Sequence, residues 1–359
     1  MRDFQKDYSF FQDGEKLFEA AMQGNAPRVP VFAQMHEYAM KEIGANATEF
    51  YSTPELLSYG TLEISEKIGL DIPCLDYDCY NIEAEALGQK MIWSDKNIPD
   101  IDRNQLLING PQDLDRIKIP DFDNGRGRKI VEAKRLFLEA TGLQPALGFC
   151  APFSFAANVR GIEPLLLDLY TDPGFARELF TRATENVITP WILYQKEHFP
   201  DALSITGSDA TASLPIVSPD ILREWIIPYI LRLRELCGPE LSVPNWVGEA
   251  FLSDPCEMLD LKLEVTTKYI EGQDPDVETL GPELYKQYAK KHDVPLILGI
   301  GACFMAFSKP DQVAERVKCY VESGKDYGRF ALYLCNLGDT TPPENVEAAI
   351  DAVRTYGVY

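Results

Sequence analysis

The 359-residue sequence predicts a (β/α)8 barrel, a single domain over residues 1–359 with a helical extension at its N-terminus. Eight short apolar segments alternate with segments of helical character. Several of the eight are apolar throughout rather than at alternate positions, which is typical of parallel strands buried on both faces. No Gly-x-Gly-x-x-Gly motif follows a strand and no linker divides the chain, which disfavours the rival interpretation as two doubly wound domains.

The first half of the chain predicts four strands, each ending at polar or turn-forming residues. We expect a helix around 15–22, which carries Ala and Leu and few helix breakers. We expect strands at 29–35, 72–75, 145–149 and 202–206. Helices follow at 52–68, 127–140, 154–170 and 173–198, and Pro54 in a first turn marks the start of one of them. Residues 81–125 predict an excursion of short strands and loops.

The second half repeats this pattern. We expect strands at 241–243, at the start of 266–276, at 294–298 and at 329–334. The stretch 266–276 begins with β-branched and aromatic residues and stops at Gly and Pro, which do not continue a strand interior. Helices are predicted at 218–236, 255–261, 281–291, 310–322 and 341–356, several of them beginning at Ser or Thr close to Pro.

The composition excludes several classes of protein. The net charge is −22, from 56 acidic and 34 basic residues, which disfavours nucleic acid as a partner. Charges or Pro interrupt every apolar run well before the ~20 residues that a membrane span needs, and the first residues lack the apolar core of a signal peptide. The eight Cys form no C-x-x-C pair. We therefore expect a reduced, cytoplasmic protein.

In a barrel of this kind the active site lies at the carboxyl ends of the strands. The residues at those ends predict an acidic cup with aromatic walls. We expect catalytic roles for Glu271, His36, Asp209 and Asp76, and substrate contacts from Tyr38, Asp78, Phe153, Asn245, Trp246 and Cys335. Simpler explanations stay open: Asp209 would cap the following helix, Asn245 would form a turn, and Cys335 would fill space.

Glu271 and His36 are the strongest of these candidates. Glu271 precedes a glycine and lies too far before the helix at 281–291 to cap it. His36 follows the first strand, whereas His198 ends a helix and His292 precedes the seventh strand, positions that belong to the opposite face of a barrel. We expect His36 on the rim as an acid, a base or a ligand, with a structural role as the alternative.

Several stretches of the chain resemble the uroporphyrinogen decarboxylase superfamily over nearly its whole length. They are Gly148-Phe-Cys-Ala-Pro-Phe-Ser-Phe with Asp168-Leu-Tyr-Thr-Asp-Pro173 after it, Asp209 followed by Ser213 and Ser218-Pro219, and the ending from Cys335 through Thr341-Pro-Pro-Glu-Asn345 to Tyr356-Gly357. The resemblance implies a (β/α)8 barrel, in agreement with the strand count. It also implies one of two broad activities, porphyrinogen decarboxylation or corrinoid-linked methyl transfer.

Two branches of the superfamily match poorly. The decarboxylases carry an Arg-Gln-Ala-Gly-Arg loop after the first strand, whose arginines bind substrate carboxylates, whereas residues 34–38 here read Gln-Met-His-Glu-Tyr. The methyltransferases that act on thiols carry His-x-Cys after the fifth strand and a Cys after the eighth, which hold zinc. Here Asn245-Trp-Val-Gly248 stands at the first site, so only Cys335 matches.

The chain is then similar to the methyltransferases of anaerobic O-demethylation, an interpretation that 271–276 and Gly281-Pro-Glu283 favour. This resemblance implies a small aromatic methyl ether as substrate and cobalamin carried by a separate corrinoid protein. It leaves a homo-oligomer open. It also leaves zinc open, with Glu271 and Cys335 as ligands, or with Glu257, Glu271 and His292 as a looser match. We expect no tightly held corrinoid, flavin or nicotinamide to copurify.

The predicted chemistry concerns the leaving group. A phenol has a pKa of about 10, so its anion departs poorly without a proton or a Lewis acid. Glu271, with a pKa raised by nearby carboxylates, or His36 would donate that proton, and Phe153, Trp246 and Tyr38 would bound a flat ring. The alternatives are a methylcobalamin-to-thiol methyltransferase, a uroporphyrinogen decarboxylase and a non-catalytic barrel that binds a small ligand.

Overall fold

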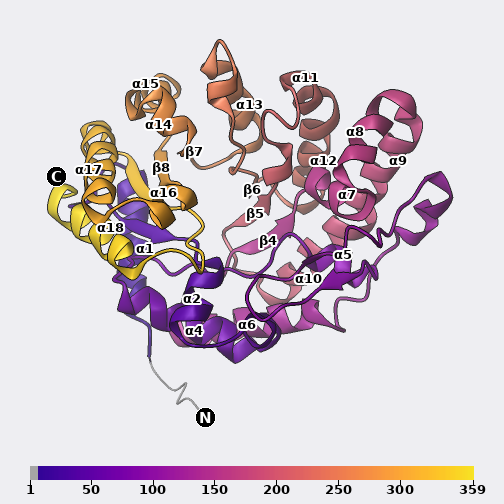
Figure 1. The fold of residues 1–359 in the computed structure, drawn as a ribbon, viewed down its shortest axis with the longest axis horizontal. Coiled ribbons are helices and arrows are strands. Elements are labelled where there is room, and N and C mark those ends of the chain that lie inside the picture. Colours follow the sequence, from indigo (N-terminus) through magenta and orange to yellow (C-terminus); the bar gives the residue numbers. More distant parts are fainter. Residues whose placement is uncertain (1–6) are drawn as a thin grey trace.

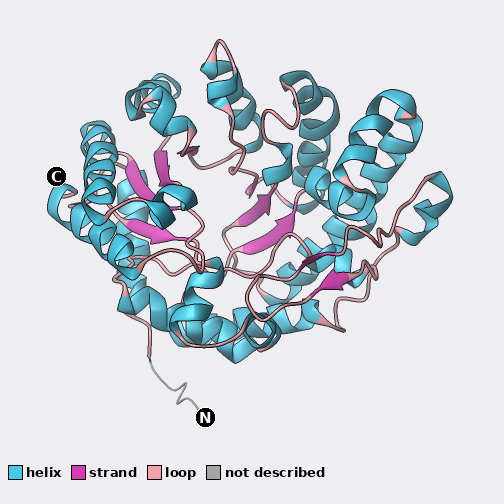
Figure 2. Ribbon diagram, in the orientation of Figure 1, coloured by secondary structure: helices cyan, strands magenta, loops and turns pink. Residues whose placement is uncertain are grey.

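The structure, a computed structural model, describes residues 7–359 of the chain. The strands lie in the middle of the molecule and the helices form a ring around them (Figure 1). Figure 2 shows the same arrangement by secondary structure, with the short parallel strands in magenta inside a cyan helical layer. This is the arrangement that alternating strands and helices produce when the strands pair in parallel.

The parallel strands form two sheets. In the first the order is β1 (Val31–Ala33), β9 (Phe330–Leu334), β8 (Leu296–Ile300) and β7 (Ile270–Gln273). In the second the order is β4 (Leu147–Cys150), β5 (Ile205–Ser208) and β6 (Leu241–Ser242). β8 and β9 are buried at every position, as predicted for strands that are covered on both faces.

The prediction of a second strand at 72–75 is wrong. This segment contributes a single parallel bridge, in which Ile72 lies opposite Phe32. Within residues 7–359 no ladder joins this segment to β4, and none joins β6 to β7. Pro73 explains part of this, because it has no N–H to donate to a neighbouring strand. The segment still occupies the place of the second strand beside β1.

The sixth strand begins later than predicted. Helix α13 (Pro255–Val265) extends to Val265 rather than to 261, and residues 266–269 connect it to β7. The predicted helix at 154–170 is divided into α7 (Pro152–Arg160) and α8 (Ile162–Thr171) by Gly161, whose φ of 88° is unfavourable for residues with a side chain. The excursion after 81 contains the antiparallel pair β2 (Met91–Ile92) and β3 (Asp100–Ile101).

The remaining helices complete the ring. They are α1 (Phe11–Met22), α2 (His36–Glu42), α3 (Ala47–Ser52), α4 (Pro54–Lys67), α5 (Ile82–Ala86), α6 (Arg126–Thr141), α9 (Pro173–Arg182), α10 (Thr189–His198), α11 (Pro219–Ile221), α12 (Ile227–Cys237), α14 (Asp276–Leu280), α15 (Pro282–His292), α16 (Ala302–Phe307), α17 (Pro310–Tyr327) and α18 (Pro343–Tyr356). Many begin with Pro, whose missing N–H costs nothing in a first turn. Asp172 caps α9 by accepting from the Phe175 N–H at 3.1 Å.

The hydrophobic core lies between the strands and the helical ring. Leu147, Ile205, Leu241 and Leu296 on the strands are fully buried in one cluster with helix residues such as Trp191. Each such side chain stabilises the fold by about 1.5–3 kcal/mol relative to an exposed position. The cysteines are all free thiols. Between residues 7 and 359, no helix is both long and apolar enough to cross a membrane.

Candidate active site

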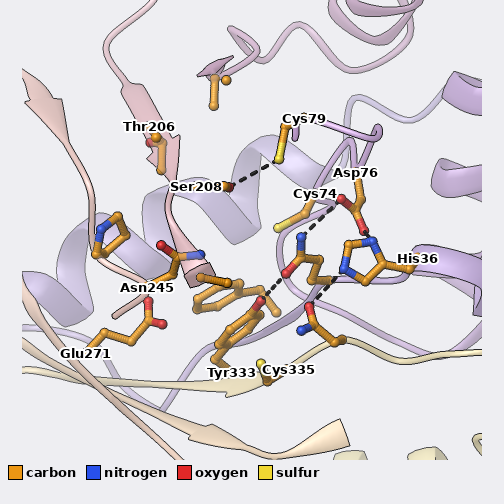
Figure 3. A pocket seen from close by; sticks show the side chains of 18 of the residues that line it. His36, Cys74, Asp76, Cys79, Thr206, Ser208, Asn245, Glu271, Tyr333 and Cys335 are labelled. Atoms are coloured by element: carbon orange, nitrogen blue, oxygen red, sulfur yellow. Dashed lines mark hydrogen bonds and ion pairs between the residues drawn. The ribbon is translucent and has the colours of Figure 1, made fainter. Parts of the chain in front are cut away.

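A cavity of about 400 Å³ opens among the carboxyl ends of the strands (Figure 3). Five of the residues predicted for the site line it: His36, Asp76, Asn245, Glu271 and Cys335. Aromatic side chains form much of the remaining wall, namely Phe32, Tyr77, Tyr80, Tyr269 and Tyr333. Among the described residues that line the cavity there is no Lys and no Arg. Its volume and aromatic lining are typical of sites for small molecules.

One wall is a hydrogen-bonded chain that starts at Tyr333. The Tyr333 hydroxyl donates to Gln34 Oε1 at 2.7 Å, and Gln34 Nε2 donates to Asp76 Oδ1 at 3.1 Å. The other Asp76 oxygen lies 2.9 Å from His36 Nδ1 as an ion pair. His36 Nε2 lies 3.0 Å from Oδ1 of Asn336. Asp76 and Asn336 thus present oxygens to both ring nitrogens, which favours the doubly protonated imidazolium.

The charge state of His36 follows from two opposing effects. Burial by itself lowers the pKa of an imidazole, but the negative charge of Asp76 more than offsets this and raises the pKa of His36 to about 9. The His36 side chain is 20% exposed, so part of the ring borders the cavity while both of its nitrogens face oxygen partners. At neutral pH this wall therefore carries a fixed positive charge beside the Asp76 carboxylate.

The opposite wall carries Glu271, on β7. Cys335 donates from its thiol to Gln273 Oε1 at 3.0 Å, and Gln273 Nε2 donates to Glu271 Oε1. Within residues 7–359 no hydrogen bond occupies Glu271 Oε2. Burial raises the pKa of Glu271, while the hydrogen bond from Gln273 and the nearby Lys262 partly offset this effect. The shift is in the direction of the neutral acid, and a proton on this carboxyl would lie on Oε2 because Oε1 already accepts from Gln273.

The floor of the cavity is fixed by a close approach between two segments. The Tyr77 hydroxyl donates to the Gly148 carbonyl at 2.8 Å. A Cβ on Gly148 would lie 2.5 Å from that hydroxyl, so a larger residue would displace Tyr77. Lys134, which is 1% exposed, donates to the same hydroxyl at 3.3 Å. This contact joins the loop after the 72–75 segment to β4, and no backbone ladder links that segment to β4 within residues 7–359.

Two predicted acids do not line the cavity. Asp209 is fully buried, with Oδ1 accepting from the Ser154 N–H at 3.0 Å and Oδ2 from Trp246 Nε1 at 3.2 Å. Asp78 forms a buried ion pair with Arg126 at 2.6 Å. Burial raises the pKa of each carboxyl to about 6. Both oxygens of Asp209 are committed to holding α7 and the loop after β6, which is a structural role.

Three predicted aromatic walls are also placed elsewhere. Tyr38 packs in the core on α2 with 1% of its surface exposed, and Phe153 on α7 is fully buried and stacks on Phe180 with the ring centroids 6.1 Å apart. Trp246 is fully buried against Asp209. Each follows a strand end, but its side chain points into the helical layer. The prediction that these three rings bound the substrate is therefore corrected to the tyrosines and Phe32 named above.

The residues present do not fit the predicted zinc sites. In the described part of the chain no group of three or more His, Cys, Asp or Glu is arranged to hold a metal ion. Glu257 pairs with Arg223 at 2.6 Å, and His292 stacks on Tyr288 with the ring centroids 4.2 Å apart. Glu271 is buried with Gln273 instead of joining either of them. The looser ligand set of the three residues is therefore wrong.

The sequence prediction missed several lining residues, of which Gln34, Gln273, Tyr333 and Tyr80 matter most. A signal for two of them exists, because alternate residues of a strand share a face. Gln273 lies two residues after Glu271, and Tyr333 two residues before Cys335. Gln34 lies in the connection between β1 and α2, outside either element. Tyr80 lies in an irregular loop, where no such periodicity applies.

Comparison with known proteins agrees with this architecture. A methyltransferase structure from Methanosarcina mazei superposes with a TM-score of 0.74, over 98% of this chain and 99% of that chain, at 19% sequence identity. A methylated-thiol–coenzyme M methyltransferase of Methanosarcina mazei is 24% identical over 283 residues, which is 76% of this chain and 70% of that protein.

The predicted barrel fold and superfamily are thereby confirmed. The family model of uroporphyrinogen decarboxylase (URO-D) matches residues 13–356, nearly the whole chain. The protein belongs to the uroporphyrinogen decarboxylase family.

Proposed function

We propose that this protein is a methyltransferase that takes a methyl group from a small aromatic methyl ether and passes it to the cobalt of a corrinoid held by a partner protein. The observation that carries the proposal is Glu271: a buried acid in a cavity with aromatic walls, whose Oε2 has no hydrogen-bond partner among residues 7–359. A carboxylic acid with a raised pKa is the group that an aryl ether needs at its departing oxygen.

Within the family, decarboxylation of a uroporphyrinogen is the less suitable activity. Its substrate carries many carboxylates, which bind best to Arg and Lys. The described residues of the cavity wall include neither, and His36 is already paired with Asp76. The lack of Lys and Arg in the described cavity wall therefore supports a substrate of low charge.

A thiol methyltransferase is the second candidate, and one observation favours it. The relative that is 24% identical bears that name, and Cys74, Cys79 and Cys335 line the cavity. However, the Cys79 thiol donates to Ser208 Oγ and the Cys335 thiol to Gln273 Oε1. Within residues 7–359 no group of three or more His, Cys, Asp or Glu is arranged to hold a metal that would activate a thiol. The position after β6 holds Asn245, which hydrogen-bonds to the Asp209 N–H at 2.9 Å. The residues therefore favour the ether.

The proposed reaction breaks the bond between the methyl carbon and the aryl oxygen. The reduced corrinoid, as methyl acceptor, supplies the electron pair for the new bond to the methyl carbon. The aryl oxygen keeps the electron pair of the broken bond and takes the proton from Glu271 Oε2, which leaves a free phenol. Glu271 is then reprotonated from water. The Gln273 N–H, donating to Oε1, holds the carboxyl in place and stabilises the carboxylate that forms.

His36 has a separate part in this proposal. Both of its ring nitrogens face oxygen partners, so it is not free to donate a proton. Its positive charge lies in the same cavity, on the side opposite Glu271 in Figure 3. There it offsets the negative charge of Asp76 and lowers the cost of a developing phenolate.

The proposal is tested by incubating the protein anaerobically with guaiacol and reduced cobalamin, free or bound to a corrinoid protein of the same organism. We expect catechol and methylated cobalamin in equal amounts, measured by chromatography and absorbance. Demethylation of methylthio compounds but not of guaiacol would instead support the thiol-directed activity. Binding of guaiacol without any product would indicate a non-catalytic barrel.

A further inference from the structure

Tyr80, in the loop after the 72–75 segment, has an unusual hydrogen-bonding position. Its hydroxyl oxygen accepts from Asn245 Nδ2 at 3.0 Å and from the Ala210 backbone N–H at 3.3 Å. A backbone N–H is always a donor. The two neighbours therefore occupy the oxygen lone pairs and leave the hydroxyl proton as the group that remains to be paired.

The orientation of the Asn245 amide is fixed by its other contact. Asn245 Oδ1 accepts from the Asp209 backbone N–H at 2.9 Å, and that N–H cannot act as an acceptor. A flipped amide would bring two donors together, so Nδ2 must face Tyr80. Both partners of the Tyr80 oxygen are thus obligate donors.

The Tyr80 proton has no acceptor within residues 7–359, and the side chain lines the cavity. Two other tyrosines that line the cavity, Tyr77 and Tyr333, use their hydroxyl protons in hydrogen bonds within the protein. Tyr77 gives its proton to the Gly148 carbonyl, and Tyr333 gives its proton to Gln34. Tyr80 therefore has a donor to offer to a molecule in the cavity, whereas the hydrogens of Tyr77 and Tyr333 are already used.

We propose that Tyr80 is a specificity-determining residue that donates a hydrogen bond to an oxygen of the bound substrate and thereby selects oxygen ethers over thioethers. The inference rests on the proposed function for the class of ligand. An ether oxygen accepts a hydrogen bond, whereas a thioether sulfur is a weak acceptor. A donor that loses its partner in a closed cavity is penalised, so a thioether of similar shape should bind less well.

The protonation state of Tyr80 agrees with this role. Burial raises the pKa of the phenol, although the two donors and their hydrogen bonds act in the opposite direction. The hydroxyl therefore keeps its proton throughout the neutral range. It acts as a donor that stays in place and not as a base.

The experiment measures binding of methoxybenzene and (methylthio)benzene to the full protein by calorimetry, without a corrinoid. The two probes differ only in oxygen against sulfur. Tyr80→Phe should weaken the binding of methoxybenzene roughly 5–100-fold, which is the effect of one lost hydrogen bond in a buried site. The same variant should change (methylthio)benzene much less. The double difference between probes and variants isolates the oxygen contact from changes of shape.

Tyr333→Phe is the matched control, because it removes a hydroxyl from the same cavity whose proton is bound to Gln34. It should alter the affinity for the two probes equally. Asn245→Asp is a second variant, in which a carboxylate would accept the Tyr80 proton and withdraw it from the cavity. It should reproduce the loss of selectivity, and it keeps the inference testable if Tyr80→Phe folds poorly.

Equal effects of Tyr80→Phe on both probes would overturn the inference, as would failure of the wild-type protein to bind methoxybenzene at millimolar concentration. A different set of results would contradict the proposed function and leave the inference about Tyr80 intact. If the oxygen preference depends on Tyr80 but no methyl group reaches reduced cobalamin, Tyr80 is a specificity residue of a protein with another activity. Conversely, if the protein transfers methyl groups but Tyr80→Phe keeps the preference for the oxygen ether, only the inference about Tyr80 would be contradicted.

Discussion

Glu271 at β7 and Asp209 after β5 are both buried carboxyl groups at the carboxyl ends of strands, yet they face different surroundings. Burial raises the pKa of both. Glu271 has one oxygen bound by Gln273 and the other free of protein partners in the described chain, and it lines the cavity. Asp209 has both oxygens bound, by Ser154 and Trp246, and is fully buried.

The difference is one of register. Tyr269, Glu271 and Gln273 all line the cavity and are spaced by two residues. Thr206 and Ser208 line it from β5, so Asp209, one residue further, points away. A strand end therefore provides two kinds of position, one for chemistry and one that holds the next helix, and the alternation of the strand decides which is which.

The largest effect expected from this comparison is on turnover. Glu271→Gln removes the acid proton while keeping the shape of the side chain. The rate of methyl transfer should fall on the order of 10²–10⁴-fold, the usual contribution of general acid catalysis. Binding of the aromatic substrate should change little.

Glu83→Gln is the matched control for this variant. Glu83 is also fully buried, burial raises its pKa to about 8, and it bonds to the Cys150 N–H at 2.8 Å without lining the cavity. Its replacement should leave methyl transfer unchanged. A comparable loss of turnover in Glu83→Gln would mean that any buried acid matters and that Glu271 has no special position.

The pH dependence of stability tests the charge state of His36, a further ionisable group of the cavity. Its pKa rises from 6.5 in the unfolded chain to about 9, so the folded state binds the proton more tightly. The resulting stabilisation, about 3 kcal/mol at most, is fully present below pH 6.5 and is lost as pH rises to 9. The difference in unfolding free energy between wild type and His36→Gln should shrink over that interval in urea titrations. Parallel curves would mean that Asp76 does not hold the proton on His36.

Asp209→Asn should produce a smaller effect, and on stability rather than chemistry. An amide retains the bond from the Ser154 N–H but turns an NH₂ group towards the Trp246 indole N–H, so that two donors face each other. The expected loss is about 1–3 kcal/mol in unfolding free energy. Methyl transfer should decline far less than in Glu271→Gln. A severe loss of turnover with normal stability would mean that Asp209 takes part in catalysis after all.

The sequence was sufficient for the barrel because apolar strands and Pro-initiated helices follow local rules. It was also sufficient for His36, Asp76 and Glu271 as residues of one cavity, since strand ends converge in such a fold. It was insufficient for Phe153 and Tyr38, whose orientation depends on the helix that each enters. It was also insufficient for the 72–75 segment. This segment forms one bridge to β1 and no ladder within residues 7–359, an outcome that depends on long-range pairing and not on local sequence.

Methyl transfer from a series of substituted methoxybenzenes, whose phenols span a range of pKa values, tests the central claim most directly. If Glu271 protonates the departing oxygen, the rate of the wild-type protein should depend only weakly on the pKa of the phenol. The rate of Glu271→Gln should fall steeply as that pKa increases, so that activated phenols lose least. A uniform loss across the series would contradict the account and would mean that Glu271 only shapes the cavity.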